Sequence, residues 1–130
     1  MILLAAGLIL AALAALLHIY IFYLESIAWT RPVAMKTFGT TIAQAEATRE
    51  LAFNQGFYNL LLAIVTGIGI GLVPVVGAVG YALVFAGTGS MLAAAAVLFL
   101  SSAGKRGAAL KQGVLPLLAI LALVFDILPI

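Results

Sequence analysis

Four long apolar runs take up most of this 130-residue chain, and only short polar stretches separate them. A run of about 20 apolar residues can cross a bilayer as a helix. Helices and closed barrels alone satisfy every backbone hydrogen bond in lipid, and the alternating pattern of barrel strands is absent. The sequence therefore predicts an all-α integral membrane four-helix bundle. The predicted spans of this single domain are residues 2–24, 51–73, 75–100 and 112–130.

The composition excludes several classes of protein. Apolar and aromatic residues make up 66% of the chain and charged residues 8%, whereas a soluble domain has about 25% charged residues. The chain has no cysteine, which excludes zinc ribbons, disulfide scaffolds and cysteine nucleophiles. The first apolar run lacks a basic start and is too long for a secretory signal. No basic aromatic stripe indicates a nucleic acid partner, so the expected partner is the lipid bilayer.

The six basic residues predict the orientation of the bundle. Three lie in the connection at 25–50 and three at 101–111, whereas the connection at 71–74 carries no charge. The first and third connections of a four-span chain share one side of the membrane. Basic residues favour the cytoplasmic side, so we predict both termini on the outer side of a multi-pass protein.

The connection at 25–50 is too long for a simple turn. Good helix formers follow Thr41, whereas Pro32 breaks the segment before it. We expect a partly helical cytoplasmic connection that runs from Thr41 into the second span. Within that span, Gly67 and Gly71 have a spacing that permits close helix packing.

Polar residues on the first span share one stripe. His18, Glu25 and Trp29 are seven and four residues apart, which places them on one face of a helix. A charged side chain at mid-membrane costs about 2.5–3.5 kcal/mol, and such residues tend to face the bundle interior and to be functional. At 1.5 Å per residue, His18 lies about 10 Å deeper than Glu25.

The second span enters the membrane from the same side with polar residues of its own. Glu50, Asn54 and Tyr58 are four residues apart, and Gln55 and Asn59 form a neighbouring pair. Antiparallel packing would bring the imidazole, the carboxylates and the amides to one depth. We therefore predict a polar cavity near the cytoplasmic side, between the first two transmembrane helices.

The chemistry of these side chains gives each an expected role. A histidine can carry a proton near neutral pH, and a carboxylate can act as a general acid or base. Amides donate and accept hydrogen bonds and can orient a ligand. The candidate catalytic residues are His18, Glu25 and Glu50. The candidate substrate-binding residues are Trp29, Asn54, Gln55, Tyr58, Asn59 and Gln112, the last of which would complete the roof of the cavity.

Simpler explanations compete with these roles. His18 could bond Asn54 or Glu50 and only join two helices, and Trp29 could be an interfacial anchor. A histidine with two glutamates could also hold a divalent metal. However, the chain has no HExxH or similar ligand spacing, so we predict no metal site, and the cofactor stays unknown.

Residues 54–59 read NQGFYN and follow an H-x6-E-x3-W arrangement formed by His18, Glu25 and Trp29. This pattern resembles a family of small four-span bacterial membrane proteins of unknown function marked by NQGxYN. The likeness covers essentially the whole chain, including the glutamine at position 112. It implies the four-span fold and a bacterial inner (plasma) membrane location, but it implies no reaction.

A weaker likeness is topological. Membrane-associated eicosanoid and glutathione (MAPEG-like) proteins also have four spans and outward termini, and they act as trimers that hold glutathione near the cytoplasmic side. Arg49, Glu50, Asn54 and Asn59 lie in the corresponding region here, but their spacing differs and no second arginine starts the motif. The likeness implies a homo-oligomer.

Three functions stay open at this point: a small intramembrane enzyme, a small-solute transporter component, and a structural or regulatory membrane subunit. Transporters often have helices broken at mid-membrane, whereas the one candidate break here, at 67–74, lies near the outer loop. A structural subunit, whose polar residues serve only helix packing, would need fewer polar groups at one depth. The sequence favours an enzyme that acts on a lipophilic small molecule by His/Glu acid–base chemistry, as a homo-oligomer (dimer or trimer).

Overall fold

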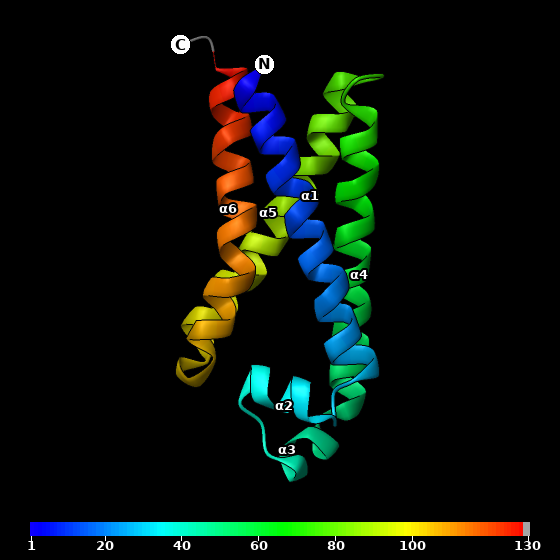
Figure 1. Cartoon of the computed structure of the whole chain (residues 1–130), viewed down its shortest axis with the longest axis vertical. Coiled ribbons are helices and arrows are strands. Elements are labelled where there is room, and N and C mark those ends of the chain that lie inside the picture. The colour runs from blue at the N-terminus through cyan, green and yellow to red at the C-terminus, as the bar shows by residue number, and fades with distance from the viewer. Residues whose placement is uncertain (129–130) are drawn as a thin grey trace.

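The computed structural model describes residues 1–128, and Figure 1 shows them as a bundle of helices. Four helical segments are long and apolar enough to cross a membrane, which confirms the predicted all-α four-helix fold. These segments are Ile2–Ile27, Arg49–Leu72, Gly77–Ser101 and Ala103–Ile127. The last two residues of the predicted span 112–130 lie outside the described residues.

The long helices are joined by short helical elements. The first segment contains α1 (Ile2–Phe22) and the π-helical turn η1 (Tyr23–Ile27). The second and third segments are α4 (Arg49–Leu72) and α5 (Gly77–Ser101). The fourth segment contains the 3-10 turn η2 (Ala103–Lys105) and α6 (Arg106–Ile127). Two short helices, α2 (Pro32–Phe38) and α3 (Ile42–Ala47), lie in the first connection.

Each long helix packs mainly on two neighbours, in the order α1, α4, α5, α6 and back to α1. Helix α1 lies beside α6 at the end that holds the N-terminus and crosses towards α4 at the other end, where α2 and α3 lie (Figure 1). Asp126 marks the first end, because its Oδ1 lies 3.8 Å from the amino group of Met1. The start of α1 and the end of α6 therefore lie together at one end of the molecule.

Small residues let the helices approach closely. A Cβ placed on Gly69 would lie 2.7 Å from the backbone nitrogen of Val84, so α4 and α5 touch there. Gly67 and Gly71 make no such close contact within the described chain, because a Cβ on either residue would meet nothing within 4 Å. The buried face of α4 passes through Thr66 and Gly69 instead.

The first connection is more broken than the sequence indicates. Thr41 and Gln44 form a reciprocal capping box that starts α3. This helix does not run directly into the second span, because the backbone of Thr48 (φ −107°, ψ 7°) separates α3 from α4. Pro32 occupies the first turn of α2, so it begins a helix rather than only interrupting one.

The two short helices are held against the end of the bundle by an apolar cluster. The rings of Trp29 and Phe38 lie 5.3 Å apart between their centroids, and both side chains are buried. Trp29 Nε1 also donates a hydrogen bond to Thr48 Oγ1 at 3.2 Å. These contacts make α2 and α3 part of the wall of the adjoining site.

Candidate functional site

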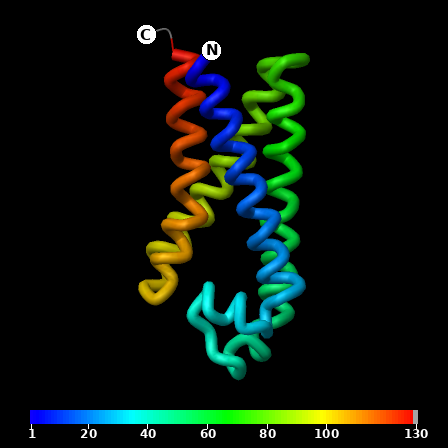
Figure 2. The backbone as a smooth tube through the Cα atoms, in the orientation of Figure 1, coloured from blue at the N-terminus to red at the C-terminus, as the bar shows by residue number. Residues whose placement is uncertain are grey.

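A cavity of about 540 Å³ lies at the end of the bundle that carries α2 and α3. Figure 2 shows the chain paths of α1 and α6 diverging towards this end. Every long helical segment contributes to its lining, together with the first connection. Its principal polar and aromatic lining residues are Glu25, Trp29, Gln55, Asn59, Lys105 and Gln112.

A carboxylate and an amide form the centre of the cavity wall. Asn59 Nδ2 donates a hydrogen bond to Glu25 Oε2 at 2.7 Å and also lies 3.2 Å from the carbonyl oxygen of Gln55. Glu25 is half-buried, within a segment apolar enough to span a membrane. The bond joins the end of the first span to α4, so Asn59 fixes the position of this carboxyl group.

Two local features bring Glu25 to α4. The end of the first span winds into a π-helical turn, with the backbone nitrogen of Ala28 donating to the carbonyl oxygen of Tyr23 at 2.9 Å. Such turns are rare and often occur at functional sites. Gly56 then lets the turn lie directly on α4, because its Cβ would be 3.0 Å from the nitrogen of Ser26. Ser26 Oγ completes the contact by donating to the carbonyl oxygen of Phe53 at 2.8 Å.

The remainder of the cavity combines polar groups with apolar surface. Lys105 is half-buried where α6 begins, whereas Leu51 and Leu98 supply apolar wall. Thr40 also lines the cavity, and its buried Oγ1 has no hydrogen-bond partner among the described residues. A buried polar atom without a partner is costly, so a bound molecule that donates to Thr40 Oγ1 would remove that cost. The arrangement suits a ligand with one polar end and an apolar body.

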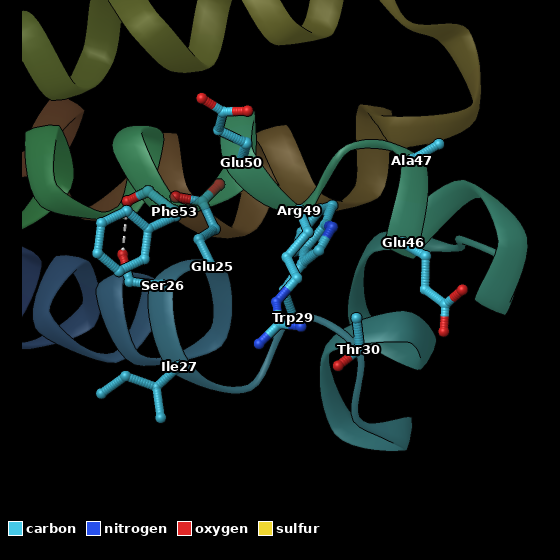
Figure 3. Close-up of a pocket in the computed structure, with 10 residues that line it drawn as sticks. All are labelled: Glu25, Ser26, Ile27, Trp29, Thr30, Glu46, Ala47, Arg49, Glu50 and Phe53. Atoms are coloured by element: carbon cyan, nitrogen blue, oxygen red, sulfur yellow. Dashed lines mark hydrogen bonds between the residues drawn. The ribbon is translucent and has the colours of Figure 1, made fainter.

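A second pocket of about 530 Å³ lies on the other side of Glu25 and Trp29, which line both spaces. Arg49 and Glu50 line this second pocket together with Trp29, and Figure 3 shows Glu46 pointing away from Trp29. In residues 1–128 no group of three or more histidine, cysteine, aspartate or glutamate side chains is placed to hold a metal ion.

His18 does not reach the cavity that we expected it to share. Its side chain is 1% exposed, and its Nδ1 lies 2.8 Å from the carbonyl oxygen of Ala14 in the same helix. It is not among the described residues that line either pocket beside Glu25. The seven-residue separation places His18 two turns deeper, and its own helix supplies its partner. The alternative, a bond from His18 to Asn54 or Glu50, is likewise not formed among the described residues.

The NQGFYN segment divides between two faces of α4 about 100° apart. Gln55 and Asn59 line the cavity, whereas Asn54 and Tyr58 are exposed on the outside. Asn54 and Tyr58 each lie two residues from the buried Gly56, and a helix turns about 100° per residue, so both point away from the bundle. Asn54 and Tyr58 therefore do not line the cavity in which we expected them, and Glu50 lines only the second pocket.

Lys105 and Thr40 are two of the lining residues that the sequence did not identify as site residues. Lys105 belongs to a basic loop, and the preference of basic residues for the cytoplasmic side already explains its charge without a role in a site. Thr40 precedes the helix cap at Thr41 and has no sequence signal of its own. The place of both residues depends on how the first connection packs against the start of α6.

The fold and the cavity define a small multi-pass membrane protein with a polar site at one end of a four-helix bundle. The chain matches a family model over residues 12–124 and belongs to that family, which is described as Protein of unknown function (DUF1304). Membership of an uncharacterised family is thereby confirmed, whereas the NQGxYN mark and the MAPEG-like resemblance stay predictions. No curated protein and no solved structure matches the chain.

Proposed function

We propose that this protein is a small intramembrane enzyme that binds a lipophilic molecule in the cavity and uses Glu25 as its acid–base group. The observation that carries the proposal is the carboxylate of Glu25, held by Asn59 at 2.7 Å on the wall of a 540 Å³ cavity. Ionisable groups within a membrane span are costly and mark functional sites. His18, which is bonded to its own helix, has no part in the proposed chemistry.

The lining residues supply distinct parts of this activity. Asn59 occupies Oε2 of Glu25, which leaves Oε1 to face a substrate. Gln55, Gln112 and the ammonium group of Lys105 would orient the polar end of that substrate. Leu51 and Leu98 would contact its apolar body.

An isomerisation by proton shift fits these residues without a second reactant. The carboxylate removes a proton from one carbon of the substrate, a double bond moves, and the Glu25 carboxyl group, whose proton exchanges with solvent water, returns a proton to another carbon. Charge and atoms balance within the one molecule. General acid–base catalysis of this kind contributes about 10²–10⁴ in rate.

Deuterium exchange tests the proposal even before the substrate is identified. The purified protein is incubated in D₂O with a total lipid extract, and mass spectrometry records which compounds take up deuterium. We expect at least one lipophilic compound to be labelled by the unchanged protein. Glu25→Gln should lower the labelling at least a hundredfold, because it removes the base but keeps the shape of the side chain.

Glu50→Gln is the matched control, since Glu50 is exposed and does not line the inner cavity. It should label the same compound at an unchanged rate. If no compound takes up deuterium, or if Glu25→Gln labels as fast as Glu50→Gln, the enzyme proposal fails and a structural role for the Glu25–Asn59 pair explains the site better.

A further inference from the structure

An apolar groove of about 330 Å³ lies between α5 and α6, apart from the cavity described above. Small residues make it concave: Ala95, Ala96, Ala109 and Gly113 line it together with larger apolar side chains. A Cβ on Gly113 would lie 2.9 Å from the Cβ of Ala95, so the two helices meet at the floor of the groove. Every residue that lines the groove is apolar or glycine, as suits a hydrocarbon chain.

Arg106 lies at one end of this groove. Its Nε donates a hydrogen bond to the carbonyl oxygen of Phe99 at 3.1 Å, and its guanidinium carbon lies 4.9 Å from the centre of the Phe99 ring. Phe99 itself lines the groove. Arg106 also precedes Leu110, another lining residue, by four positions, which places both on one face of α6. The contacts with Phe99 hold Arg106 at the mouth of the groove and leave the terminal nitrogens of an exposed guanidinium for an anion.

The length of the groove corresponds to one leaflet of a bilayer. From Arg106 to Leu117 is eleven residues, or about 16 Å of helix, and half of a hydrocarbon core of about 30 Å is nearly the same. A lipid with its phosphate at Arg106 would thus place an acyl chain along the groove to its far end. Guanidinium groups bind phosphate with two parallel hydrogen bonds.

The charged residues near the groove favour one class of phospholipid headgroup over another. The sequence has no acidic residue between Glu50 and Asp126, so the residues around this groove on α5 and α6 offer no carboxylate to a choline or ethanolamine cation. Arg106 and the exposed Lys111 both favour a negative headgroup. We propose that the groove binds one anionic phospholipid, with its phosphate on Arg106 and one acyl chain between α5 and α6.

Native mass spectrometry tests the headgroup. The protein is mixed with equal amounts of phosphatidylglycerol and phosphatidylcholine that carry the same acyl chains. We expect one retained phosphatidylglycerol, preferred at least fivefold over phosphatidylcholine. Arg106→Gln should remove this preference, whereas Arg31→Gln, at an exposed arginine immediately before α2, should keep it. Equal retention of both lipids by the unchanged protein, or equal effects of the two substitutions, overturns the proposal.

A second pair of variants tests the acyl chain. Ala96→Leu fills the groove, whereas Ala93→Leu adds the same side chain to an exposed position of α5 that does not line it. Phosphatidylglycerol retention should fall severalfold in the first variant and stay unchanged in the second. If Ala96→Leu retains the lipid like Ala93→Leu, Arg106 binds only an anion and the groove is not a lipid site. Thermal unfolding of each variant checks that the fold is kept.

Discussion

The residues of the NQGFYN segment lie on different faces of α4. Gln55 and Asn59 face the cavity, Gly56 contacts the π-helical turn, and Asn54 and Tyr58 point outwards. The sequence shows two sets of polar residues four apart, and that spacing alone cannot tell which set faces inwards. Gly56 settles the question, because close packing at this position fixes the rotation of α4. The pairing of Glu25 with Asn59 depends on the same contact.

Gly56→Ala is expected to destabilise the protein by about 1–3 kcal/mol, the usual cost of overpacking. Its Cβ would meet Ser26 Oγ and lie 3.1 Å from the carbonyl oxygen of Phe22, in the contact that positions Glu25. Gly67→Ala, on the same helix, would meet nothing within 4 Å and should be neutral or stabilising by up to about 1 kcal/mol. Unfolding of both variants in detergent measures the difference. Equal stability of the two variants would contradict the packing described for Gly56.

Individual elements could be predicted to different degrees. The four spans follow from hydropathy, and the start of α3 follows from the cap at Thr41. The π-helical turn at Tyr23–Ile27 has no local sequence signal, because it forms where η1 lies against α4. The sequence indicates that His18 lies two turns from Glu25, but it does not predict which residues surround His18. Along its length α1 leaves α6 and approaches α4, so its successive turns face different helices. Crossing angles depend on the packing of all four helices.

The outward face of α4 predicts contact with a second copy of the chain. The polar side chain of Asn54 is exposed, although it lies in a segment long enough to span the membrane. Two copies inserted in the same direction would place Asn54 opposite Asn54, and an amide can both donate and accept. Leu61 and Ile68, seven and fourteen residues further on, continue this face and are 55% and 52% exposed. Such spacing is typical of a helix–helix seam.

Disulfide cross-linking in membranes measures this contact, because the chain has no cysteine of its own. Leu61→Cys and Ile68→Cys should form covalent dimers on oxidation. Leu16→Cys, at a residue of α1 that is 61% exposed, should not. Asn54→Ala should weaken dimerisation about threefold, the size of one interhelical hydrogen bond of about 0.6 kcal/mol. Cross-linking that is equally strong at Leu16 would mean random collision rather than a seam.

At the scale of the whole molecule, the basic residues gather at the end opposite the N-terminus. Arg31 and Lys36 lie in and beside α2, Arg49 begins α4, and the other three lie at and just before the first turns of α6. The start of α1, the end of α6 and the uncharged turn between α4 and α5 lie at the other end of the bundle (Figure 1). The sequence predicts that the basic residues and a polar cavity lie on one side of the membrane, and the structure brings the charges and the cavity to one end of the bundle.

Labelling of single cysteines in intact cells can establish which end faces the cytoplasm. Since basic connections are retained on the cytoplasmic side, we expect Val75→Cys, in the uncharged turn where Val75 is 75% exposed, to react with a membrane-impermeant maleimide from outside. Ala103→Cys, exposed at the start of η2, should react only after the cells are permeabilised. The opposite pattern would place the cavity and Glu25 at the outer surface, so that a lipophilic substrate would have to reach the site from the outer leaflet.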